Sequence, residues 1–275
     1  SLSQTVLSEA THLINIKGNM IMMAANGNLD AVLTQAKNVA DVVQAAPRIE
    51  NLIGRKTKGV TFKDHDINVD ELSKMYSLGL IDNSVTAEMI TKGFDAALKG
   101  PVLKKIKEKT IDPLSNIYRG EDAAFKLLSY YKELDQYAKA FPDMPKEQLE
   151  VYVADVVKNT LPSYSNLPRA IKSLKSLPLG AFPAFFVESI RTSKNIAKIG
   201  IQDLRKGAVL TARGAASGDK ELMKQGAMLT RIGTRRVASL GAVAYAGETY
   251  FTYRNSEMGI TPKEDQTLSS LGPRW

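Results

Sequence analysis

Apolar residues recur at helical spacing through most of this chain, and that periodicity restricts its fold more than any other feature. From Gln4 to Ala25 they fall at mixed three- and four-residue intervals, until Asn26-Gly27-Asn28 interrupts the pattern. A second helix is predicted over Leu29–Ala46, where Pro47 stops it, so the first two helices should form an antiparallel hairpin. No segment shows convincing strand alternation. The sequence therefore predicts an all-α, multi-helix fold of about ten helices with no sheet, compact or elongated.

The same periodicity predicts further helices along the chain. Pro145 should lie in the first turn of one of them, and Asp219 should cap another, with Glu221 in its first turn. The polar stretch Gly54–Asp66 is typical of a linker. The helices are expected over Asp70–Leu80, Thr86–Leu98, Pro101–Tyr118, Glu121–Ala140, Pro145–Lys158, Ala184–Lys206 and Asp219–Tyr245.

These elements suggest five regions. They are a helical hairpin (1–53), a linker (54–66), a helical region (67–160), a basic helical region with a proline-rich entry (161–254) and an extended tail (255–275).

Positive charge is concentrated in one part of the chain. From Arg169 to Arg236 there are 14 Lys/Arg and 4 Asp/Glu, a local net charge of +10, whereas the whole chain carries +8. The remainder therefore sums to about −2 by the same count. A basic segment of this kind favours anionic partners: nucleic acid, an anionic membrane surface or an acidic protein face.

The motifs of common catalytic sites are missing from the sequence. There is no cysteine, and the phosphate-loop, dinucleotide-binding, nucleophile-elbow and zinc-protease motifs do not occur. The two histidines, His12 and His65, lie far apart, and Asp64-His65-Asp66 is most simply interpreted as solvated turn residues. We therefore expect no enzymatic activity, no cofactor and no metal site.

The basic region supplies candidate contacts to membrane or DNA. Its helix over Ala184–Lys206 carries both apolar and cationic residues, so it could lie on an anionic surface. The alternative is an ordinary surface helix whose apolar face meets the core. For nucleic acid, the lack of aromatic residues between Arg191 and Arg236 favours salt-dependent phosphate contacts over base stacking. The candidate contacts are Arg169, Lys172, Lys175, Arg191, Lys194, Lys198, Arg205, Lys206, Arg231, Arg235 and Arg236.

Small residues recur every four positions in the last predicted helix. Such a column lets a second helix approach closely, in lipid, in an oligomer or within the same domain. Because strict four-residue spacing drifts around a helix, no single partner can contact the whole column. Its members are Gly226, Thr230, Thr234, Ala238, Ala242 and Ala246.

Several blocks of the sequence together resemble a segment of the very large internal virion proteins of tailed bacteriophages. One block runs from Tyr118 to Lys126 (YRGEDAAFK) and continues through Tyr131-Lys-Glu133 and Tyr137-Ala-Lys-Ala. Another is Asn159–Asn195, and a third runs from Asp219 to Gly233-Thr-Arg235-Arg236 and the small apolar residues that follow. The resemblance extends over roughly residues 85–247 and lies in the whole pattern.

This resemblance implies a role and no particular reaction. Such proteins are packaged in the capsid, leave with the genome and help it to cross the host envelope. The implied partners are portal or tail-channel proteins, other ejection proteins, further copies of the chain, double-stranded DNA and the host membrane surface. The implied locations are the virion interior and then the host cell envelope. A chain that begins at Ser1 without methionine is expected to be processed or a segment of a longer protein.

Two alternatives remain open at this point. One is a helical protein that binds nucleic acid nonspecifically, and the other is the non-catalytic part of a virion RNA polymerase polypeptide.

Overall fold

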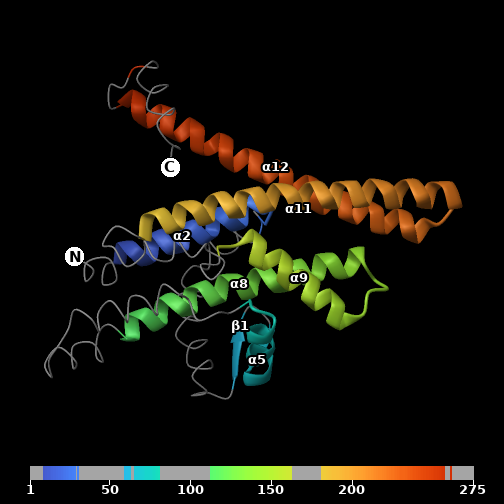
Figure 1. Cartoon of the computed structure of the whole chain (residues 1–275), viewed down its shortest axis with the longest axis horizontal. Coiled ribbons are helices and arrows are strands. Elements are labelled where there is room, and N and C mark those ends of the chain that lie inside the picture. Colours follow the sequence, from blue (N-terminus) through green and yellow to red (C-terminus); the bar gives the residue numbers. More distant parts are fainter. Residues whose placement is uncertain are drawn as a thin grey trace, which may run out of the picture.

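The computed structural model of this protein describes residues 9–28, 30, 59–62, 65–80, 112–162, 181–257 and 261. The structural statements below concern these residues. They contain six helices and one two-stranded hairpin (Figure 1). The elements are α2 (Glu9–Ala25), β1 (Gly59–Phe62), β2 (His65–Asn68), α5 (Val69–Ser77), α8 (Asp112–Ala140), α9 (Lys146–Thr160), α11 (Ala181–Ser217) and α12 (Lys220–Glu257).

The predominantly helical character predicted from the sequence is confirmed, whereas the count of about ten helices is not. A local exception is the antiparallel pair β1–β2, which occupies part of the predicted linker and departs from the expectation of no sheet. Its register pairs Gly59 with Asn68 and Phe62 with His65. The run Val60-Thr61-Phe62 has strand-forming residue types, but it is too short to produce a recognisable alternation.

Several predicted elements lie wholly or mainly outside the described residues. They are the helices over Leu29–Ala46 and Thr86–Leu98, most of the proline-rich entry, and the tail beyond Glu257.

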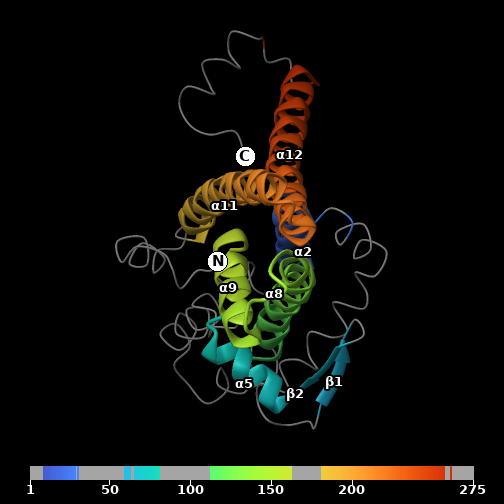
Figure 2. The ribbon, with the colours of Figure 1, turned by 90° about the vertical axis from the view of Figure 1, so that its right-hand side faces the viewer.

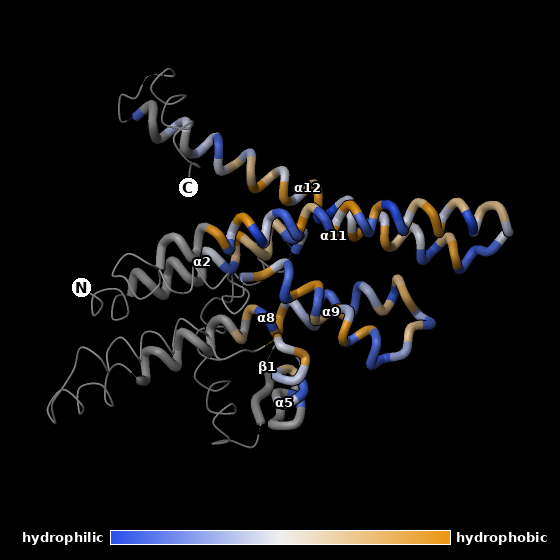
Figure 3. Tube along the Cα trace, in the orientation of Figure 1, coloured by the Kyte–Doolittle hydropathy of each residue, from blue (hydrophilic) through white to orange (hydrophobic). Residues whose placement is uncertain are grey.

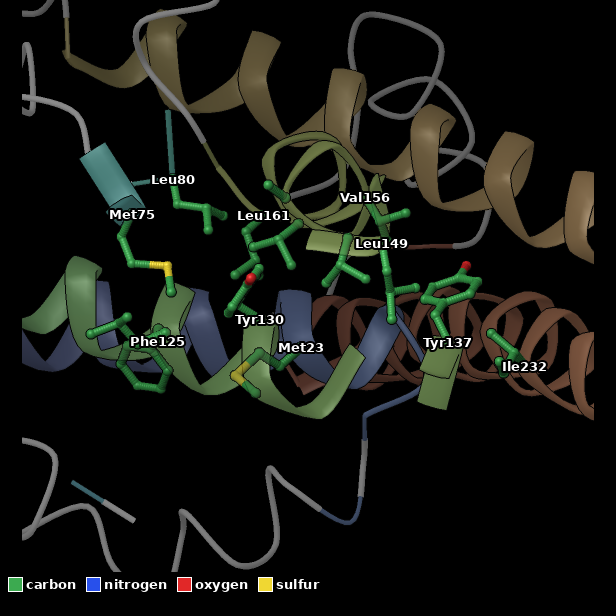
Figure 4. Close-up of a cluster of buried hydrophobic side chains, with 14 of the residues drawn as sticks. Met23, Met75, Leu80, Phe125, Tyr130, Tyr137, Leu149, Val156, Leu161 and Ile232 are labelled. Atoms are coloured by element: carbon green, nitrogen blue, oxygen red, sulfur yellow. The ribbon is translucent and has the colours of Figure 1, made fainter. Parts of the chain in front are cut away.

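The hydrophobic core lies where α8 and α9 meet α2, α5 and α12 (Figure 4). Met23 of α2, Met75 of α5, Tyr130 of α8, Val156 of α9 and Ile232 of α12 all have 5% or less of their surface exposed. Tyr137 on α8 lies edge-on to Tyr152 on α9, with ring centroids 5.0 Å apart. This core joins helices from both ends of the chain, so α12 is part of the same body as α2.

The helices α11 and α12 form a long antiparallel hairpin held together by glycines. A β-carbon built on Gly207 would lie 2.4 Å from Thr230 Oγ1 and 2.7 Å from the Gly226 carbonyl oxygen. On Gly233 it would lie 2.6 Å from the carbonyl oxygen of Gly200. These backbones can approach so closely only because the side chains between them are missing. Figure 3 shows polar and apolar residues alternating along both helices.

Both hairpin helices are longer than the sequence indicated. The predicted end of α11 at Lys206 falls directly before Gly207, yet the helix continues to Ser217. The N-cap prediction for α12 is confirmed, because Asp219 Oδ1 accepts hydrogen bonds from the backbone N–H groups of Glu221 and Leu222 at 2.9 and 3.0 Å. Beyond the predicted end at Tyr245, α12 runs on to Glu257 and projects away from the body of the protein (Figures 1 and 2). We call residues 238–257 the arm.

Among the described residues, no helix combines the length and apolar character needed to cross a membrane.

We predict that Gly207→Ala destabilises the fold, because the added methyl group must push α11 and α12 apart. Overpacking of this kind costs about 1–3 kcal/mol. The matched control is Gly241→Ala, where the new β-carbon meets nothing within 4 Å. The control should be neutral or stabilise by up to about 1 kcal/mol, since alanine favours helix. Urea unfolding followed by circular dichroism measures both, and equal effects would contradict the glycine contact.

Candidate functional site: a buried charge cluster and an exposed basic face

The most unusual group of side chains in the described structure is a buried cluster around Arg236. Only 1% of the Arg236 surface is exposed, and the two carboxylates beside it, Glu133 and Asp203, are equally enclosed. Arg236 lies on α12, Glu133 on α8 and Asp203 on α11, so three helices supply the charges. Buried charges are retained only where partners compensate the loss of water.

Each nitrogen of the Arg236 guanidinium has a partner. Nε donates to Asn26 Oδ1 at 2.7 Å, and Nη2 donates to Glu133 Oε2 at 2.7 Å. Nη1 donates to Asp203 Oδ2 and to the Tyr137 hydroxyl, both at 2.8 Å. The Tyr137 hydroxyl in turn donates to Asp203 Oδ2 at 2.6 Å. The cluster is therefore a connected network that joins α2, α8, α11 and α12.

The turn after α2 brings two asparagines into this network. Gly27 has φ = 81° and follows a helix whose last carbonyls accept from the N–H groups of Gly27 and Asn28, a Schellman cap. A β-carbon on Gly27 would lie 3.0 Å from the backbone nitrogen of Arg236, so the turn packs directly on α12. Asn26 Nδ2 then donates to Glu133 Oε1 at 2.9 Å, and Asn28 Nδ2 donates to the same oxygen at 3.3 Å.

The two carboxylates are not equally satisfied. Both oxygens of Glu133 accept hydrogen bonds, whereas Asp203 Oδ1 is buried and has no hydrogen-bond donor among the described residues. Burial raises the pKa of Asp203, although Arg236 and the hydroxyl of Tyr137 act in the opposite direction. Burial also acts to lower the pKa of Arg236, but Glu133, Tyr137 and Asp203 outweigh it and raise that pKa. Two acids share one cation, so a proton on Asp203 would relieve the excess negative charge.

The exposed charges of α11 have a single sign over its described side chains, residues 187–217. Its two acids, Glu188 and Asp203, are buried, while its cations, apart from half-buried Arg191, are exposed. At 3.6 residues per turn, these exposed cations fall within an arc of about 120° on the side of the helix opposite Gly200, Gly207 and Gly214. This basic face consists of Lys194, Lys198, Arg205, Lys206 and Arg213.

The structure separates the candidate contact residues into groups. Exposed positions are taken by Lys194, Lys198, Arg205, Lys206 and Arg231, of which Lys206 lies over the Tyr152 ring at 5.6 Å. Arg191 is half-buried and pairs with Glu188, and its Nη2 donates to the carbonyl oxygens of Lys158 and Leu161 at 3.2 and 3.3 Å. Arg235 is half-buried and donates to Asn28 Oδ1 at 3.3 Å. Arg169, Lys172 and Lys175 lie outside the described residues.

One of these predictions is wrong. Arg236 was expected to contact membrane or DNA, but its side chain is buried and neutralised inside the protein. Arg213, which was not among the candidates, belongs to the basic face. Its position seven residues after Lys206 is the signal that could have identified it, because seven residues make almost two helical turns.

The proposed column of small residues is divided in the same way. Gly226 and Thr230 pack against α11, which makes the within-domain alternative correct for this pair. Thr234, Ala238, Ala242 and Ala246 are exposed. The division follows from the drift of a four-residue repeat around the helix.

No group of three or more metal-ligating side chains comes together in the part of the chain that the structure describes. His65 and Asp66 lie at the start of β2, where their backbones pair with Phe62 and Thr61.

None of the three comparisons with known proteins, by family model, by sequence and by structure, found a match.

We predict that Arg236→Met strongly destabilises the protein at neutral pH, because it leaves Glu133 and Asp203 buried without their cation. Removing one partner of a buried ion pair typically costs about 3–5 kcal/mol. Arg231→Met is the matched control on the same helix, since Arg231 is exposed and should change stability by less than about 0.5 kcal/mol. Chemical denaturation decides the question, and a mild effect at Arg236 would show that the cluster contributes little.

The raised pKa of Asp203 predicts a pH dependence of stability. The folded protein binds this proton at a higher pH than the unfolded chain, whose aspartates titrate near pH ~3.9. The resulting stabilisation is full below that value and is lost as pH rises through the folded-state pKa. Subtracting the urea-unfolding profile of Asp203→Asn from that of the wild type should isolate this loss. Asp135→Asn, at an exposed position, should leave the profile unchanged. Parallel wild-type and Asp203→Asn profiles would disprove it.

Proposed function

We propose that this protein is a non-enzymatic structural segment of a bacteriophage internal virion protein, packaged near the portal and released with the genome. Its basic α11 face would contact an anionic partner during transfer, either the DNA or an anionic membrane surface. The resemblance in sequence motivates the phage assignment. The observation that carries the contact is the single sign of the exposed charge on α11.

The arrangement of the acids supports a contact role for this face. Glu188 is neutralised by Arg191, and Asp203 by Arg236, so neither carboxylate projects toward a partner on α11. The cations point away from α12 because the glycine contact occupies the opposite side of α11. An anionic surface would therefore meet positive charge along several turns without an opposing acid from the same helix.

The buried cluster supports a structural role for the remaining charges. Arg236, Glu133 and Asp203 each have 1% or less of their surface exposed, and they bond to one another across the helices. Their arrangement fixes how the basic hairpin is attached to the body of the protein. In this proposal the cluster holds the hairpin rigidly, and the basic face makes the contact.

Binding measurements on the folded chain test the contact. We predict that it binds double-stranded DNA, or vesicles rich in anionic lipid, with an affinity that falls steeply as salt rises. The triple variant Lys194→Gln, Lys198→Gln, Arg205→Gln should lose most of this affinity and show a weaker salt dependence. A control with the same net charge, Lys139→Gln, Lys146→Gln, Lys224→Gln, removes exposed cations outside α11 and should bind nearly as wild type does.

The outcomes separate the parts of the proposal. Binding to DNA alone or to vesicles alone identifies the anionic partner, whereas equal losses in the two triple variants would show that net charge matters and the α11 face does not. The phage assignment has its own test, peptide mass spectrometry of particles. It fails if the chain is missing from purified particles or remains in emptied ones.

A further inference from the structure

The residues through which α12 packs on α11 follow a regular repeat. They are Gly226, Thr230, Gly233 and Val237, separated by four, three and four residues. This is the spacing of a coiled-coil seam, in which positions alternately three and four apart form one nearly straight line along a helix. Each of these residues lies within contact distance of a glycine, leucine or threonine of α11. We call this line the α12 seam.

The α12 seam continues into the arm without a change of spacing. Leu240, Ala244 and Gly247 follow Val237 at intervals of three, four and three residues. Here, however, α11 no longer lies alongside (Figures 1 and 2). Ala244 is exposed, and β-carbons built on Gly241 or Gly247 would meet no described atom within 4 Å. The same surface that packs on a helix in one half of α12 is uncovered in the other half.

The separation has a cause within α11. Near its N-terminal end, α11 is held against the last turn of α9, where Arg191 donates to the carbonyl oxygens of Lys158 and Leu161. These carbonyls end a helix and need external donors. The first turns of α11 are therefore committed to α9.

The arm is also too apolar for a helix surrounded by water. Between Val237 and Tyr253 the sequence has one charged residue, Glu248. Tyr245, Tyr250 and Tyr253 are exposed by 75%, 56% and 62%. Helices that are apolar around most of their circumference are normally buried, and exposed apolar surfaces of this kind mark interaction sites.

We propose that the arm pairs with the arm of a second copy of this chain, antiparallel and about a two-fold axis near Gly247. This register places Gly247 opposite its own copy, where two backbones can approach as closely as Gly200 and Gly233 do in the hairpin. It also places Tyr250 opposite Ala244 and Tyr253 opposite Gly241, so each large ring meets a small residue. Alternation of large and small side chains across an interface is what close packing requires.

The antiparallel direction follows from charge and shape. In a parallel pair, Glu248 would lie beside Glu248 of the second copy, and the two bodies would crowd at the same end. In the antiparallel pair the bodies lie at opposite ends, and the interface is the same patch on both copies, as in closed two-fold dimers. The arm is about 30 Å long at 1.5 Å per residue, so the contact is smaller than most stable interfaces. The dimer should therefore dissociate on dilution.

Analytical ultracentrifugation of the full chain over a range of concentrations tests this pairing. The wild type should show a reversible monomer–dimer equilibrium. Ala244→Glu places a charge in the seam and should weaken dimerisation by about tenfold or more, since a buried unpaired charge is costly. The matched control is Ala242→Glu, an exposed alanine two residues away on the opposite side of the helix, which should dimerise as the wild type does. Circular dichroism should show both variants folded.

Cysteine cross-linking tests the direction, because the natural chain contains no cysteine. Gly247→Cys should form a disulfide with its own copy under mild oxidation. Leu240→Cys should not, because in the antiparallel register the two Leu240 positions lie about 20 Å apart. A monomeric wild type, equal effects of the Ala242 and Ala244 substitutions, or efficient cross-linking through Leu240→Cys would each overturn the proposal. None of these measurements depends on the proposed function.

Discussion

The rest of the fold depends on the burial of one arginine. Arg236 lies where α2, α8, α11 and α12 meet, and its hydrogen bonds have fixed directions that apolar packing alone does not impose. A shift of any one helix would leave a charged group in the interior without a partner, which costs more than the loss of a comparable apolar contact. The cluster therefore selects one arrangement of helices from those that the apolar core would tolerate.

The glycine contact and the charge cluster need each other. Asp203 can reach Arg236 because Gly200 and Gly207, on either side of it, let the backbones of α11 and α12 approach closely. The close contact of bare backbones buries little apolar side-chain area, so it gains stability chiefly from packing and from the cluster at its base. Gly27 has the corresponding role on the other side of α12, where it allows the end of α2 to touch the backbone at Arg236.

Periodicity predicted the existence of most described helices but not the chemistry between them. The break at Asn26-Gly27-Asn28 was identified as a turn, yet nothing local indicates that its two asparagines bind Glu133 and Arg236, more than 100 residues away. Arg235 and Arg236 look equivalent in sequence, but adjacent residues on a helix point about 100° apart, so one is partly exposed and the other buried. Gly207 marked a predicted helix end, although in the structure it is a contact point within the helix.

The two candidate surfaces use different sides of the hairpin and therefore do not compete. The basic face of α11 points away from α12, while the exposed part of the α12 seam lies beyond the point where the two helices separate. A dimer joined through the arms would leave both basic faces open, at opposite ends of the assembly. An extended polyanion, or a membrane, could then engage two faces at once, and the second contact would form at a high effective concentration. A weak arm contact would then strengthen when the basic faces are bound, because each binding event restricts the same pair of molecules.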